Sequence, residues 1–307
     1  MTKGFVVNTP YDDVFRTMLN DCSRLIIPVI NEIFCENYRG DEKIVFSPEI
    51  HFVNLQDGEE TKRITDSSFE IIGEKETKFL LECQSTADSS MLIRIFEYAT
   101  QIALDQGELE NNVLKVEIPR SAILFLRSNG ATPDKMTIEI KTPGGVNSFD
   151  VPVMKAQKYS IDDIFEKGLL FLIPFYIFSH ESRFQEYELD EDALKELKIE
   201  YMEIVKRLDS LLENGSISVY TKKMIVEMSN KVVNHLAQKY DNVKEGVTSI
   251  MGGKVLEYEA KQILNEGKMK QAKETAQVLR EMGMNEESIA KAVNVSVGIL
   301  KEWLGAN

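Results

Sequence analysis

The spacing of apolar residues changes along the first 160 residues, and each spacing predicts a different element. In three stretches apolar residues recur every third or fourth position, which predicts amphipathic helices. Shorter runs are continuously apolar or alternate with polar residues, which predicts strands. The expected helices are Thr9–Leu19, Leu25–Phe34 and Ser90–Gln106. The expected strands are Glu49–Leu55, Ile64–Ile72, Lys78–Ser85, Ser121–Leu126, and a hairpin of Met136–Ile140 and Ser148–Met154 around Pro143–Gly145.

From Ser160 onward the pattern is helical. A long helix is expected at Asp190–Glu213, because Asn214 and Gly215 provide a typical helix end. A second is expected at Ser218–Tyr240, and a short terminal unit at Met282–Leu304. The chain therefore predicts an α/β core of roughly 150 residues with an α-helical C-terminal extension.

Composition and charge limit the partners and the cellular compartment expected for this protein. The 307 residues carry a formal net charge of −14, which argues against a protein that coats nucleic acid nonspecifically. That charge is uneven, because Glu181–Gly215 holds 11 acidic against 5 basic residues. Three cysteines without close pairing and no signal-peptide pattern predict reduced thiols and a cytoplasmic protein. The apolar run Gly168–Phe178 is too short to span a bilayer, so we expect a buried core segment and no membrane partner.

Candidate chemistry lies on two neighbouring expected strands. Asp66 lies on the first strand, and Glu82 and Gln84 share one face of the second, since strand side chains repeat every two residues. If the strands pair, Asp66 and Glu82 meet, and such carboxylates are ligands that Mg²⁺ prefers. Asp66 alone is also typical of a turn or an edge strand. Glu82 is harder to explain without a partner, because it follows the apolar residues Phe79–Leu81.

The order of these features resembles a known family. Asp66, fifteen intervening residues, Glu82-Cys83-Gln84, an amphipathic helix and an apolar strand resemble the PD-(D/E)XK nuclease superfamily. The segments Tyr11–Arg16 and Arg94–Tyr98 resemble two further motifs of its bacterial PD-(D/E)XK nuclease family transposase, or recombination-promoting nuclease, group. The resemblance covers about residues 8–180.

This resemblance implies a restriction-endonuclease-like core, with a central mixed sheet flanked by helices, and a Mg²⁺-dependent DNA endonuclease for which Mn²⁺ can substitute. Asp66 and Glu82 would hold the metal ion. Gln84 stands where the family usually has a lysine, so an uncharged amide would position the attacking water without contributing a positive charge. Arg94 and Tyr98 lie one turn apart and would contact the phosphate or brace Glu82.

Two further parts of the sequence are compared with the family pattern. Asp12 would serve as an auxiliary acid from the first helix, although an acid at a helix N-terminus is equally explained by the helix dipole. Ile64 and Thr65 stand where the family has its proline before the first acid. The organisation implied is a nuclease-like core at 8–180, a helical extension at 181–266 and a small unit at 267–307.

The terminal unit resembles a helix-turn-helix. Asn285 and Ser296 are placed as N-caps of two short helices. Its expected apolar seam comprises Ile289, Val293, Val295, Ile299 and Trp303. From Gly267 onward there are 6 bases and 5 acids, so no basic DNA footprint is present, and a helical packing or dimerisation module is the alternative.

Two other functions stay open from the sequence. One is a catalytically degenerate DNA-binding or regulatory protein on the same scaffold, which Gln84 and the acidic surface favour. The other is a protein-interaction module that uses the acidic helices of Glu181–Glu213. No Walker loop, dinucleotide fingerprint or Ser/Cys–His pair is recognisable, so we expect no organic cofactor. Because a double-strand cut needs two active sites, a homodimer is a reasonable expectation.

Overall fold

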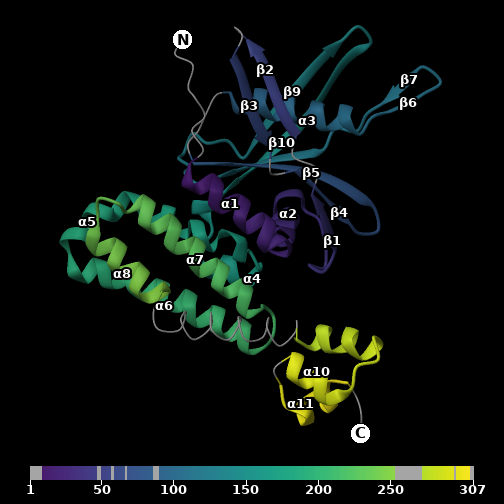
Figure 1. Ribbon diagram of the computed structural model, residues 1–307. Helices are drawn as coiled ribbons and strands as arrows, with labels where there is room; N and C mark the ends of the chain where they lie inside the picture. The colour runs from purple at the N-terminus through teal and green to yellow at the C-terminus, as the bar shows by residue number, and fades with distance from the viewer. Residues whose placement is uncertain are drawn as a thin grey trace.

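The central element of the structure is a mixed six-stranded sheet (Figure 1). The computed structural model describes residues 9–46, 50–56, 59–65, 68–85, 90–252, 272–293 and 295–304. The sheet order is β1-β4-β5-β8-β10-β9, with β5, β8 and β10 parallel to one another and the remaining neighbours antiparallel. The strands are β1 (Lys43–Phe46), β4 (Ser68–Ile72), β5 (Glu76–Gln84), β8 (Arg120–Phe125), β9 (Lys135–Thr142) and β10 (Gly145–Lys155).

Two separate two-stranded ribbons accompany the sheet. One pairs β2 with β3 and the other pairs β6 with β7, both antiparallel. Their bounds are β2 (Ile50–Gln56), β3 (Glu59–Thr65), β6 (Glu108–Glu110) and β7 (Val113–Lys115).

The helices follow the order expected from the sequence. The N-terminal helices and the crossover helix are α1 (Pro10–Asp21), η1 (Ser23–Leu25), α2 (Ile26–Phe34) and α3 (Met91–Asp105). The elements after the sheet are η2 (Ala156–Lys158), α4 (Ile161–Glu166), η3 (Leu170–Arg183), α5 (Phe184–Leu189), α6 (Glu191–Glu213), α7 (Val219–Leu236) and α8 (Asp241–Met251). A further helix spans 272–281 and is followed by α10 (Glu286–Ala292) and α11 (Val297–Trp303). An α/β fold with a mixed sheet flanked by helices and a helical C-terminal part is thus confirmed.

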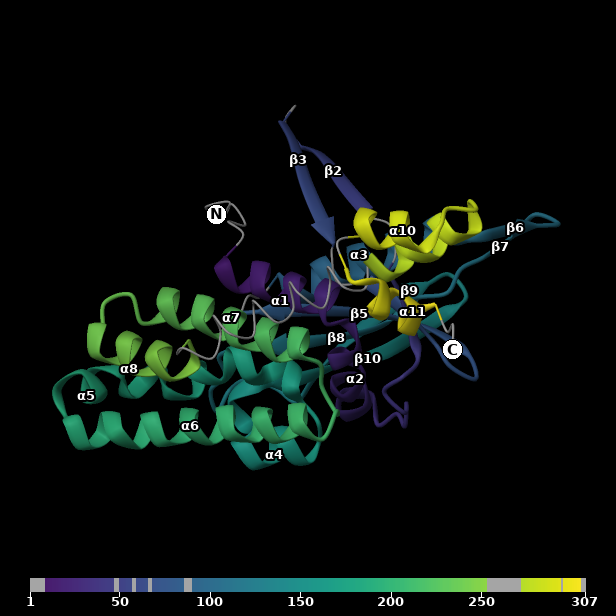
Figure 2. The same cartoon turned by 60° about the horizontal axis from the view of Figure 1, so that its bottom comes forward.

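The two faces of the sheet have separate apolar cores. Phe79, Leu81 and Cys83 of β5 belong to the larger core, which includes α1, α2, η3 and α6–α8. Leu80 of β5 belongs to the smaller core beneath α3. Both views place α1 between β5 and α7 (Figures 1 and 2), in agreement with its packing on those two elements. Helix α3 connects the parallel neighbours β5 and β8 and covers the opposite face.

One expected strand is wrong in its extent. The stretch Ile64–Ile72 is divided between β3, which pairs with β2, and β4, which pairs with β5. Since β3 opens with the polar residues Glu59–Arg63, it has no continuous apolar face for the main sheet and forms a ribbon. Strand β1 and the β6–β7 ribbon were not expected from the sequence, because they are only three or four residues long.

Several other expectations are confirmed. The β9–β10 hairpin turns at Pro143–Gly144, and Asp190 caps α6, whose end is followed by Gly215 at a φ of 76°. The apolar run 168–178 folds into η3, with Leu169–Phe175 buried. Among the described residues, no helix has the length and apolar character needed to cross a membrane.

The terminal unit has its own small apolar core. Asn285 accepts a hydrogen bond from the backbone N of Ser288 at 2.9 Å, and Ser296 accepts one from the backbone N of Ile299 at 3.3 Å, so both expected caps are present. Ile299 was wrongly placed in the seam. Its side chain is 43% exposed, whereas Leu300 is fully buried, because α11 presents the next residue to the core.

Candidate functional site

Strand β5 carries the first two candidate residues on one face. Residues on alternating positions of a strand point to opposite faces, and Leu80 packs under α3. Glu82 and Gln84 therefore lie on the α3 face near the end of β5, and both are half-buried. Ser68, two positions after Asp66 in the sequence, pairs with Leu80, two positions before Glu82. Asp66 itself lies outside the described residues.

Helix α3 brings Arg94 to Gln84. The Nη2 atom of Arg94 donates a hydrogen bond to Oε1 of Gln84 at 3.3 Å and contacts Sδ of Met91 at 3.9 Å. The Arg94 side chain is buried, at 8% exposure, so its charge lies in a poorly solvated position beside the strand. Tyr98, one turn later, is buried in the smaller core beneath α3. Arg94 and Tyr98 thus lie one turn apart on α3, and the hydrogen bond from Arg94 reaches Gln84, whereas the expected role was contact with the phosphate or bracing of Glu82.

Helix α1 brings Asp12 to the other face of the same strand end. Asp12 and Thr9 form a capping box, in which the Thr9 backbone N donates to Asp12 Oδ2 at 2.7 Å. Burial raises the pKa of the Cys83 thiol, and the nearby charges of Asp12 and Glu82 raise it further. Asp12 is therefore a helix cap, and its carboxylate also lies within electrostatic range of the end of β5.

Glu82 could serve as one ligand of a hard divalent cation. Mg²⁺ keeps several waters and takes one or two protein carboxylates, together with neutral oxygen ligands. Glu82 offers a carboxylate on the α3 face, whereas the charge of Asp12 acts on Cys83 from the opposite face of the strand end. In the part of the chain that the structure describes, no three His, Cys, Asp or Glu side chains gather as metal ligands. Asp66 is not among those residues.

Sequence reasoning missed a further residue at this end of the sheet. Arg127 follows β8 and donates from Nη1 to the backbone oxygen of Ser85, the residue after Gln84, at 3.0 Å. It also binds Glu181 through Nε at 2.5 Å and Nη2 at 2.8 Å. The sequence could have pointed to Arg127 through its position as the first charged residue after the apolar run 121–126.

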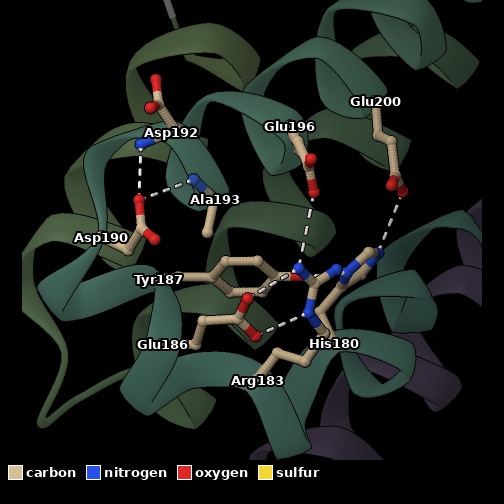
Figure 3. Close-up of polar contacts among 9 residues, drawn as sticks. All are labelled: His180, Arg183, Glu186, Tyr187, Asp190, Asp192, Ala193, Glu196 and Glu200. Atoms are coloured by element: carbon tan, nitrogen blue, oxygen red, sulfur yellow. Dashed lines mark hydrogen bonds and ion pairs between the residues drawn. The ribbon is translucent and has the colours of Figure 1, made fainter.

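A second polar cluster lies between η3, α5 and α6, as Figure 3 shows. His180 Nδ1 lies 2.9 Å from the Tyr187 hydroxyl, and its Nε2 lies 3.1 Å from Glu200 Oε2. The Tyr176 hydroxyl donates to the same Glu200 oxygen at 2.6 Å. The contact with His180 and the hydrogen bond from Tyr176 lower the pKa of Glu200, against an opposing effect of burial. These contacts join helices and include none of the candidate residues on β5, α1 or α3.

Comparison with known proteins provides no assignment. The chain matches no protein-family model, no curated protein and no solved structure.

Proposed function

We propose that this chain is a Mg²⁺-dependent DNA endonuclease of the PD-(D/E)XK type, with Glu82, Gln84, Asp66 and Arg94 at its centre. The observation that carries the proposal is the hydrogen bond from Arg94 to Gln84 at the end of β5, on the strand face that Gln84 shares with Glu82. A carboxylate, an amide and a buried guanidinium at one strand end suit the binding of a cation and a phosphate.

The topology around this point supports a restriction-endonuclease-like core. Strand β4 is antiparallel to both β1 and β5, whereas β5 and β8 are parallel and connected through α3. This arrangement places the end of β5 beside the first turns of α3, where Arg94 contacts Gln84. Active sites in open sheets with parallel strands commonly lie outside the carboxyl ends of those strands.

Each side chain has a role in phosphodiester hydrolysis. Asp66 and Glu82 would hold the metal ion, which when bound polarises a phosphoryl oxygen and lowers the pKa of water. Gln84 orients the attacking water by hydrogen bonding, and Tyr98 would contact the phosphate or brace Glu82 from the smaller core. Asp12 serves as an auxiliary acid from α1.

Arg94 can supply the positive charge that Gln84 lacks. An amide brings no charge, whereas the usual lysine at that position stabilises the negative charge that develops on the phosphate. The Arg94 guanidinium lies within hydrogen-bonding distance of Gln84, so a positive charge is held at this position by a neighbouring residue. Arg94 thus supplies the charge, and Gln84 supplies the orientation.

The wider role that we propose is the cutting of DNA during recombination or on mobile DNA, in the cytoplasm of a bacterium. A double-strand cut would require two copies of the site, which a homodimer provides. A DNA-binding protein without cleavage is the second candidate, favoured by the bond that already occupies the Gln84 amide oxygen.

Incubation of the purified protein with supercoiled DNA and Mg²⁺ or Mn²⁺ tests the proposal. We expect metal-dependent nicking that is lost when Asp66→Ala and Glu82→Ala are combined. DNA retention at low salt without any cleavage would support the second candidate, since low salt most favours binding to phosphates. Absence of both would point to the protein-interaction module.

A further inference from the structure

Arg127 and the backbone beside it hold two consecutive carbonyl groups at the end of β5. The backbone N of Leu126 donates to the Gln84 oxygen at 2.8 Å, and Arg127 Nη1 donates to the Ser85 oxygen at 3.0 Å. These bonds fix the chain immediately after Glu82 and Gln84. A shift of this backbone would therefore move both candidate side chains.

The guanidinium of Arg127 is itself fixed from the other side. Its Nε and Nη2 atoms form a bidentate pair with Glu181 at 2.5 and 2.8 Å. The Arg127 Cζ atom lies 4.9 Å from the centre of the Phe178 ring. The rigid fork of an arginine satisfies such a planar, two-point contact, and the single ammonium of a lysine does not.

Arg127 also reaches the helix that carries Asp12. Its Cζ lies 6.0 Å from the ring of Tyr11, which is buried and packs edge-on against Phe178 at 4.9 Å. Tyr11 precedes Asp12 in the first turn of α1. One side chain therefore contacts the strand end after Gln84 and the helical turn that bears Asp12.

We propose that Arg127, held by Glu181, is a positioning residue that keeps Glu82 and Gln84 arranged for a divalent cation. This inference rests on the proposed function. Because Glu181 lies near the end of η3, the helices after the sheet contribute to the site through this pair. Both side chains are about one-third exposed to solvent, at 30% and 32%. Loss of the ion pair should therefore change the geometry of the strand end more than the free energy of unfolding.

The chain contains a matched control for this pair. Arg183 binds Glu186 through Nε at 2.9 Å and Nη2 at 3.1 Å, and lies 4.7 Å from the Tyr187 ring. It is a second bidentate pair stacked on an aromatic ring, two residues after Glu181 (Figure 3). Its contacts in the described structure lie on η3, α5 and α6.

The test compares Arg127→Lys and Glu181→Gln with Arg183→Lys and Glu186→Gln in the full chain. Calorimetry gives the dissociation constant for Mn²⁺ alone, and nicking of supercoiled DNA gives kcat and KM separately. Residues that orient metal ligands typically account for about 10- to 100-fold in affinity or activity. We expect Arg127→Lys and Glu181→Gln to weaken Mn²⁺ binding and lower kcat within that range, with little change in KM. The Arg183 and Glu186 variants should stay within about twofold of the wild type.

The outcomes separate the two proposals. Equal Mn²⁺ affinity and equal kcat in the Arg127 and Arg183 variants would overturn the positioning role and leave the nuclease proposal intact. A wild type that binds Mn²⁺ but never cuts DNA would overturn the nuclease proposal. In that case, a loss of Mn²⁺ affinity confined to the Arg127 and Glu181 variants would still support positioning. A wild type that binds no Mn²⁺ would overturn both.

Discussion

Glu200→Gln is the substitution that tests the packing of the helices most sharply. Glu200 lies on α6 and receives the Tyr176 hydroxyl at 2.6 Å, with His180 Nε2 at 3.1 Å (Figure 3). His180 is buried, at 7% exposure, so it depends on protein partners rather than on water. Glutamine preserves the shape of the side chain and removes its charge.

The expected cost follows from these contacts. A hydrogen bond to a charged group contributes about 1.5–3 kcal/mol. The Glu200 side chain is 36% exposed, so solvent screens part of that contribution, and the glutamine oxygen still accepts one of the bonds. We therefore expect Glu200→Gln to lower the free energy of unfolding by about 1–3 kcal/mol at neutral pH.

Chemical denaturation of the wild type and two variants measures this cost. Glu196→Gln is the matched control, because it removes the same charge from the same helix. Its side chain is 68% exposed and lies 3.4 Å from Arg183, so its effect should be near zero. The difference between the two effects is independent of the overall change in net charge, because each variant loses one negative charge.

The effect should also depend on pH in a defined direction. The contacts with His180 and Tyr176 lower the pKa of Glu200 from its ordinary value of 4.5. A carboxylate with a lowered pKa in the folded state stabilises the protein above its ordinary pKa and loses that contribution as the pH falls through the lowered value. The advantage of the wild type over Glu200→Gln should therefore persist at neutral pH and shrink below about pH 4.5. Equal effects of the two variants, or a difference that does not change with acid, would refute this reasoning.

Two further predictions concern packing and capping. Phe171 is fully buried and packs edge-on against Phe15 at 5.3 Å, so Phe171→Ala should cost about 3–5 kcal/mol in denaturation, whereas Leu189→Ala, at 78% exposure, should have little effect. An equal loss in both would contradict the assignment of the larger core. Asn285→Ala removes the cap of the seven-residue helix α10, so it should cost about 1 kcal/mol of local stability and speed amide exchange at Ser288. Met282→Ala, at 73% exposure, is its control, and unchanged exchange in the Asn285 variant would contradict the capping role.

Much of the helical structure could be predicted because local signals define it. The Thr9–Asp12 capping box, the Asp190 cap and the positive φ of Gly215 are encoded within a few residues of the helix ends they define. The apolar strand at 121–126 was equally clear, since its five core residues are consecutive.

The rest depends on partners distant in sequence. Strand β1 has only four residues, and its place beside β4 follows from the pairing of Phe46 with Phe69. The 64–72 run is divided because its first part pairs with β2 and its second part pairs with β5. For the candidate site, periodicity was sufficient to put Glu82 with Gln84 and Arg94 with Tyr98. The Arg127–Glu181 pair joins residues 54 positions apart, and no local pattern predicts such a contact.

The most direct test of the nuclease proposal is the rate at which the protein nicks supercoiled DNA in Mg²⁺ or Mn²⁺, measured for the wild type, Glu82→Gln and Glu76→Gln. Glu76 begins the same strand, β5, and is exposed, so its variant controls for the loss of a charge from that strand. The account predicts nicking by the wild type and by Glu76→Gln, abolished by a metal chelator and by Glu82→Gln. Nicking that persists undiminished in Glu82→Gln, or a wild type that never cuts DNA with either metal, would contradict it.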